Sequence, residues 1–155
     1  MPTQQWDVRP HSERWSAGEL AGHLIATERR ILAGLDRVLQ KPPIPRPFLK
    51  RFHIPLALVE VRLIRLKAPS AVEGKITAEK DEMLSELCGV RERTLAFMEE
   101  TNGRDLSPYF MPHPFLGTLT TYEWLEFIAS HQIRHTKQMM EIVEALPKNI
   151  AKLQK

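Results

Sequence analysis

A chain of 155 residues, 43% hydrophobic and 26% charged, has the length and composition of one folded globular domain, which excludes a disordered protein. Its net charge of +3 is small, and the single cysteine, Cys88, excludes an internal disulfide and a multi-cysteine zinc site. No apolar run reaches the ~18–20 residues of a membrane span, and the first residues lack the apolar core of a signal peptide, so we expect a cytoplasmic protein without membrane contact.

The first predicted helix covers about residues 17–40. Ser16 stands where an N-cap is expected and Glu19 completes a capping box, while Trp15 and Leu20 occupy the two positions of a hydrophobic staple. At 100° per residue this helix has one apolar face, and His23 lies near the edge of that face. The face consists of Leu20, Leu24, Thr27, Ile31, Leu35 and Val38.

A basic segment, residues 41–75, follows the first helix. Residues 41–47 contain four prolines and predict an extended connector, whereas residues 48–67 are compatible with a further helix that is buried on more than one side. The segment carries eight positive and two negative side chains, a net charge of +6. They are Lys41, Arg46, Lys50, Arg51, Arg62, Arg65, Lys67 and Lys75 against Glu60 and Glu73.

Two more helices are predicted, at about residues 78–101 and 121–146. The middle helix has an apolar stripe and stops at Asn102-Gly103, and the last helix repeats the capping box with Thr120 and Glu123. No period-2 pattern predicts a strand, so we expect an all-α protein built as a helical bundle. The two stripes are Met83, Leu87, Val90, Thr94 and Phe97, and Trp124, Ile128, His131, His135, Ile142 and Leu146.

Three histidines carry the candidate chemistry. His131 and His135 are four residues apart, so their rings project from one helix face at the spacing that lets two imidazoles bind one ion. Both lie on an apolar stripe, as His23 nearly does, and buried polar groups need partners. A shared divalent ion would satisfy all three rings. The alternative is three core histidines, each with its own hydrogen bond to the backbone or to another side chain.

Two blocks of sequence, spread over about residues 9–146, resemble the DinB-like superfamily, and the second block resembles its DinB_2 branch. The first block is Trp15-Ser16-x-x-Glu19-x-x-x-His23-Leu24 with Glu28. The second is His113-Pro114-x-x-Gly117-x-Leu119-Thr120-x-x-Glu123-Trp124 followed by His131-x-x-Arg134-His135-x-x-Gln138. The resemblance implies an up-down four-helix bundle that holds a divalent metal, often nickel or zinc, on three histidines. Carried over to this chain, the ligands would be His23, His131 and His135.

The chain departs from the superfamily at its start. Members usually have another long helix ahead of the Trp-Ser pair, and here fifteen residues precede Ser16. The usual N-terminal helix is then shortened or missing. Either residues 48–67 complete the bundle, or a partner chain supplies its fourth wall, or the gene start is truncated. Because three helices leave apolar surface uncovered, we expect a homodimer.

The superfamily includes S-transferases and isomerases that use mycothiol or bacillithiol, together with many members of unknown reaction. The resemblance therefore implies a divalent-metal-dependent transferase or hydrolase acting on a small molecule, with a low-molecular-weight thiol as a second cofactor. Three protein nitrogens leave a position for water or substrate, which is the catalytic pattern. The alternative is a bundle that binds metal or ligand without turnover, and nucleic-acid binding is not indicated because no recognition motif is present.

Further residues have assigned roles in this interpretation. The basic segment would lie at the open mouth of the metal site and attract an anionic substrate, or else form an ordinary solvated surface. Gln138 would hydrogen-bond a bound ligand, and Glu28 would pair with Arg134. His113 is interpreted as a loop-packing residue, His53 as a surface or packing residue, and His11 as a surface residue.

Overall fold

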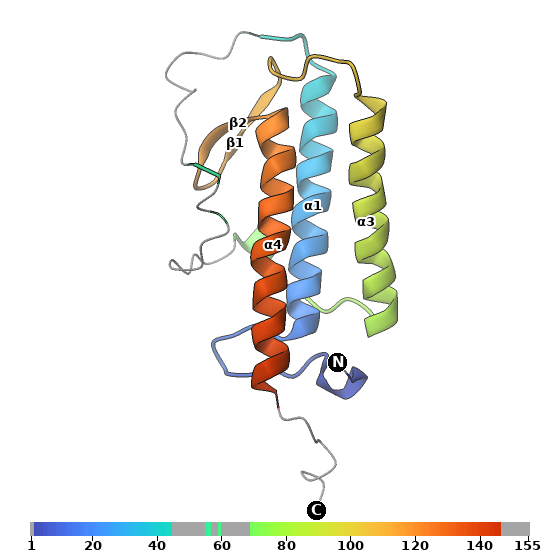
Figure 1. Cartoon of the computed structure of the whole chain (residues 1–155), viewed down its shortest axis with the longest axis vertical. Coiled ribbons are helices and arrows are strands. Elements are labelled where there is room, and N and C mark those ends of the chain that lie inside the picture. Colours follow the sequence, from blue (N-terminus) through green and yellow to red (C-terminus); the bar gives the residue numbers. More distant parts are fainter. Residues whose placement is uncertain (1, 45–54, 57–58, 60–68, 147–155) are drawn as a thin grey trace, which may run out of the picture.

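Three long helices form the body of the protein in the computed structural model, which describes residues 2–44, 55–56, 59 and 69–146. They run side by side along the long axis of the molecule (Figure 1). The elements in chain order are η1 (Thr3–Gln5), α1 (Ala17–Leu39), η3 (Ser70–Val72), α3 (Lys80–Glu100), β1 (Phe110–His113), β2 (Gly117–Thr120) and α4 (Thr121–Ala145). The three predicted helices are confirmed, and their ends differ from the expected ones by two residues at most.

The two predicted capping boxes fix the starts of α1 and α4. The backbone N–H of Glu19 donates to Ser16 Oγ at 3.1 Å, and the backbone N–H of Ser16 donates to the Glu19 carboxylate at 2.8 Å. Thr120 and Glu123 repeat both bonds at 3.3 and 2.6 Å. Each box satisfies N–H groups that the first helical turn would otherwise leave without partners.

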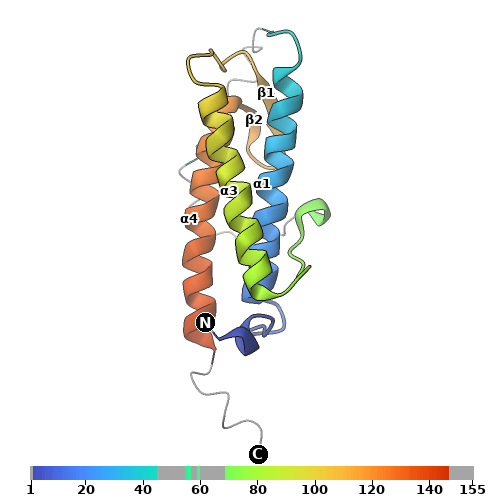
Figure 2. The ribbon, with the colours of Figure 1, turned by 90° about the vertical axis from the view of Figure 1, so that its right-hand side faces the viewer.

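The core lies between α1 and the other two helices. Helix α1 packs against both α3 and α4 (Figure 2), and the predicted stripes of all three face inward. The largest fully buried side chains include Phe97, Leu20, Leu35 and Met83, which belong to α3 and α1. Within the described residues, no helix combines the length and the apolar character that a membrane span needs.

One buried carboxylate links the three helices. Glu28 on α1 is 4% exposed, accepts a hydrogen bond from the Thr94 hydroxyl and pairs with Arg91 at 3.1 Å. Arg91 also donates to Gln132 of α4 at 3.2 Å. Arg134, the residue expected to pair with Glu28, donates instead to the backbone carbonyl of Val59 at 3.1 Å. The Glu28 carboxylate is therefore stabilised by two side chains of α3, Thr94 and Arg91.

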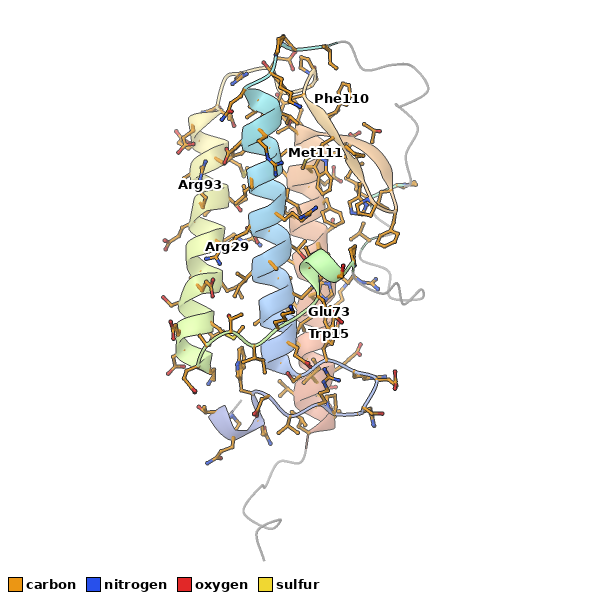
Figure 3. The ribbon with its side chains drawn as sticks, turned by 180° about the vertical axis from the view of Figure 1, so that it is seen from behind. Trp15, Arg29, Glu73, Arg93, Phe110 and Met111 are labelled. Carbon is orange, nitrogen blue, oxygen red and sulfur yellow. The ribbon has the colours of Figure 1, made fainter. Side chains whose placement is uncertain are left out.

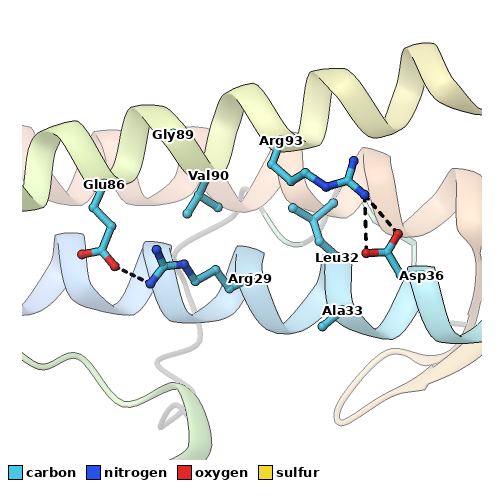
Figure 4. Close-up of a pocket in the computed structure, with 8 residues that line it drawn as sticks. All are labelled: Arg29, Leu32, Ala33, Asp36, Glu86, Gly89, Val90 and Arg93. Atoms are coloured by element: carbon cyan, nitrogen blue, oxygen red, sulfur yellow. Dashed lines mark hydrogen bonds and ion pairs between the residues drawn. The ribbon is translucent and has the colours of Figure 1, made fainter.

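A shallow groove of about 400 Å³ runs along the outer side of α1 and α3 (Figure 4). An ion pair between Arg29 and Glu86 closes one end, and Arg93 bonds Asp36 at 3.3 Å at the other. The floor between them includes apolar side chains such as Leu32. Exposed ion pairs contribute little to stability, so the apolar contacts beneath them are the main interactions that hold α1 against α3 here.

A small β-hairpin corrects the all-α expectation. Strands β1 and β2 pair antiparallel, with Phe110 opposite Thr120 and His113 opposite Gly117, so the predicted absence of strands is wrong. The strands are four residues long and β1 includes a proline, which is too short and irregular for a period-2 pattern. The indole N–H of Trp124 donates to the Met111 carbonyl at 3.2 Å and ties the hairpin to α4.

The protein is therefore mostly helical, with three long helices and one two-stranded sheet among the described residues. A complete four-helix bundle is not shown. The helix expected over residues 48–67 falls almost wholly outside the described residues, as do His53 and the basic residues Arg46, Lys50, Arg51, Arg62, Arg65 and Lys67.

The hairpin histidine predicts a pH dependence of stability. His113 Nδ1 accepts the backbone N–H groups of Phe115 and Leu116 at 3.1 Å each, and burial lowers the pKa of His113 to about 4. The unfolded chain, with a histidine pKa of about 6.5, binds a proton first as the pH falls. The contribution of neutral His113 to the free energy of unfolding is therefore fully present above pH 6.5. It declines toward pH 4, by about 1–2 kcal/mol after allowance for solvent screening.

Urea unfolding of wild type and His113→Gln, with a chelator present in both, measures this contribution. The variant is expected to lose less stability than wild type between pH 7 and pH 4. Equal losses in the two proteins would contradict the prediction, because they would show that folding does not lower the pKa of His113.

Candidate metal centre

Three imidazole nitrogens meet at one point between α1 and α4. Nε2 of His131 lies 3.2 Å from Nε2 of His23 and 3.1 Å from Nε2 of His135. The three rings come from positions up to 112 residues apart, and their nearest ligand atoms all lie within 4.8 Å of one another. The structure therefore brings together all three histidines that the sequence singled out.

Packing of α1 against α4 creates this convergence. His131 and His135 lie one turn apart on α4, and their ring centroids are 4.4 Å apart. His23 approaches from α1 with ring centroids 5.1 Å from His131 and 4.9 Å from His135. His23 and His135 are only 5% and 7% exposed, whereas His131 is half-buried.

Aromatic side chains line the cluster on two sides. The Trp15 ring lies 4.8 Å from the His23 ring, and the Phe127 ring stacks on His131 at 5.2 Å with an interplanar angle of 27°. These contacts restrict how far the imidazoles can rotate. They also keep water away from part of the site, which strengthens any charge interaction inside it.

Hydrogen bonds on the outer nitrogens set the direction of two rings. His23 Nδ1 lies 2.6 Å from the Val72 carbonyl oxygen, which can only accept, so Nδ1 carries the proton and Nε2 presents a lone pair to the cluster. His135 Nδ1 lies 2.9 Å from Gln138 Oε1, and with this amide assignment Nδ1 again donates. Metal-binding histidines typically have such an outer partner.

Burial favours the neutral form of His23 and His131. It lowers the pKa of His23, and the hydrogen bond to Val72 only partly opposes this effect. Burial, followed by the neighbouring charges of His135, His23 and Arg134, lowers the pKa of His131 to about 2. A metal ligand must be unprotonated, so neutral rings are ready to bind at physiological pH.

The geometry fits a divalent metal. With nitrogen–metal bonds of about 2.0–2.1 Å, tetrahedral coordination places two ligand nitrogens about 3.3–3.4 Å apart. The two separations from His131 Nε2, 3.1 and 3.2 Å, are close to that value, and the ligand atoms of all three histidines lie within 4.8 Å of one another. Two inward lone pairs face a third nitrogen that can donate at most one proton. Separate hydrogen bonds satisfy the outer nitrogens of His23 and His135 but not their inner lone pairs, whereas a shared cation would satisfy all three inner nitrogens.

Other candidate residues have different roles. His113 contacts the rings of Trp124 and Phe127 and lies outside the cluster, which supports the loop-packing interpretation. Gln138, expected to bind a ligand, instead bonds His135. His11 is exposed, as expected.

Sequence reasoning missed one orienting group, the Val72 carbonyl, and assigned the other, Gln138, to a bound ligand instead of to His135. The Val72 carbonyl belongs to the backbone, which has no side-chain signal, and its partner His23 is 49 residues away. Gln138 had a usable signal, because a residue three positions after a helical histidine lies on the same face.

Comparison with known proteins gives two matches. The model of the DinB superfamily matches residues 1–139. The chain is also similar to an uncharacterized protein, YuaE of Bacillus subtilis (strain 168), with 30% identity over 144 residues, which cover 92% of this chain and 86% of that protein.

We predict that the protein, purified without a metal-affinity tag, contains about one equivalent of divalent metal per chain, measured by elemental analysis. Removing one of three ligands by His131→Ala should lower the affinity by more than the about 10–100-fold that loss of an outer hydrogen-bond partner costs. The control is His11→Ala, which removes an exposed histidine and should leave the metal content unchanged. Full metal content in His131→Ala would contradict the assigned ligand set.

Proposed function

Because the chain belongs to the DinB superfamily, we propose that it is a divalent-metal-dependent enzyme acting on a small molecule, with His23, His131 and His135 as the metal ligands. The observation that supports this best is the convergence of three Nε2 atoms at 3.1 and 3.2 Å. Three protein ligands leave a coordination position free for a substrate, whereas structural zinc sites use four. Zinc and nickel both suit imidazole ligands.

The ligand set favours an anionic partner. The residues that form the cluster are all histidines, so no carboxylate among them neutralises the two positive charges of a bound metal. Arg134 adds positive potential, since its charge acts on His131. A metal in such a site supplies Lewis acidity and lowers the pKa of a bound thiol or water. A deprotonated thiol is a strong nucleophile, so we propose a thiol-dependent S-transferase, and hydrolysis is the second candidate.

Each group of residues around the candidate metal site would have a separate role. The three histidines hold the metal, and the Val72 carbonyl and Gln138 fix the direction of His23 and His135. Trp15 and Phe127 shield part of the site from water. Of the basic residues proposed to attract an anionic substrate, Lys41 and Lys75 are described and exposed.

We also propose that the protein acts as a homodimer. Large apolar side chains stay exposed on α3 and α4, among them Leu95 at 58% and Met140 at 59%. Covering such side chains is a common reason for self-association. Sedimentation at micromolar concentration should give twice the chain mass for wild type and a larger monomer fraction for Leu95→Glu. A wild-type monomer would contradict the proposal.

Thiol binding tests the proposed reaction class. Cobalt(II)-loaded protein, titrated with bacillithiol or mycothiol, is expected to develop a saturable near-ultraviolet absorption, because a thiolate would occupy the free position. His131→Ala is the matched control and should show no such band. Transfer of the thiol to a small electrophile is then followed by mass spectrometry of the product.

The other outcomes separate the alternatives. Ester or amide hydrolysis that needs metal but not thiol would indicate the hydrolase. Metal binding without either reaction would favour the non-catalytic metal-binding bundle and would count against an enzyme.

A further inference from the structure

A strap of five residues, 72–76, lies across the N-terminal half of α1. It begins at the end of η3, and Figure 3 shows η3 and the following chain crossing the face of α1 near the labelled Glu73 and Trp15. The strap approaches the helix so closely that backbone meets backbone. Two glycines, one on each side, make this approach possible.

Gly22 provides the space on the helix side. A Cβ at this position would lie 2.0 Å from the carbonyl oxygen of Lys75. Gly74 provides the space on the strap side, where a Cβ would lie 2.1 Å from the carbonyl oxygen of Glu19. Real Cβ atoms do not come this close, and a backbone carbonyl cannot swing aside as a flexible side chain can. Any larger residue at either position must move the strap away from α1.

The position of the strap decides the position of the Val72 carbonyl. Val72 is the first residue of the strap, and its carbonyl oxygen lies 2.6 Å from His23 Nδ1. Among the described residues, the Thr27 hydroxyl also lies near that nitrogen, but at 3.5 Å it makes at best a weak bond. Gly22 directly precedes His23, so the close approach occurs beside the ring that depends on it.

We propose that Gly22 and Gly74 are positioning residues for the histidine cluster. By letting the strap dock on α1, they hold the Val72 carbonyl on His23 Nδ1. That bond fixes the proton on Nδ1 and directs Nε2 toward His131. The proposal rests on the metal-binding function proposed above.

The variants Gly22→Ala and Gly74→Ala test the role of the strap. Each is expected to weaken binding of Co²⁺ alone by about 10–100-fold, the usual effect of losing an outer partner of a metal-bound histidine. Titration against a competing chelator measures this affinity. The control is Gly89→Ala in the middle of α3, where an added Cβ meets no atom within 4 Å, so its affinity should equal that of wild type.

The control also separates positioning from helix propensity. Alanine favours a helix more than glycine does, so both Gly22→Ala and Gly89→Ala improve the propensity of their helices. A weaker affinity in Gly22→Ala alone therefore reflects the contact with the strap. Circular dichroism and thermal unfolding in the presence of a chelator verify that each variant is folded.

The His23 tautomer gives a second readout that does not need metal. Long-range ¹H–¹⁵N spectra of the metal-free protein should show the proton of His23 on Nδ1 in wild type and in Gly89→Ala. They should show a mixture of tautomers in Gly22→Ala and Gly74→Ala. If wild type bound no metal, the proposed function would fail, and this comparison would still decide the role of the strap.

Folded Gly22→Ala and Gly74→Ala proteins with wild-type Co²⁺ affinity and a wild-type tautomer would overturn the proposal. Should both variants fail to fold, wild type alone decides the matter. A His23 proton on Nε2 in the metal-free protein would overturn the proposal, and a proton on Nδ1 that exchanges slowly with solvent supports it.

Discussion

The packing of α1 against α4 is the constraint on which the rest of the candidate site depends. It brings His23 within 3.2 Å of His131, although the two residues are 108 positions apart. In this partly dry site His23 and His135 direct lone pairs toward Nε2 of His131, which can donate at most one proton. A divalent cation would resolve this conflict, so the same contact that stabilises the helices also brings together three histidines that could hold a metal ion.

The surroundings of the cluster serve this geometry. Outer hydrogen bonds from His23 to Val72 and from His135 to Gln138 direct two of the three rings inward. Burial lowers the pKa values of His23 and His131 and keeps them in the form that binds metal. The buried carboxylate of Glu28, by contrast, is held by Thr94 and Arg91 of α3, so the principal acidic group of the core is committed to joining helices.

Failures of the sequence interpretation have a common cause. The hairpin has two four-residue strands, too short for a periodic pattern, and it is held partly by the bond from Trp124 to the Met111 carbonyl. The expected pairing of Glu28 with Arg134 failed because helical periodicity gives the face of a residue but not the helix that covers it. The strap was missed because a glycine indicates a close approach of backbones only when the segment that packs against it is known.

The sequence by itself determined the three helices, both capping boxes, the buried stripes and the three histidines. These features depend on local rules: hydrogen bonds within one turn and a repeat of 3.6 residues. Only the tertiary structure decided that the three Nε2 atoms meet at one point, that a backbone carbonyl orients His23, and that Gly22 and Gly74 admit the strap. Such contacts join distant parts of the chain, and a backbone atom or an absent Cβ leaves no pattern among side chains that could predict them.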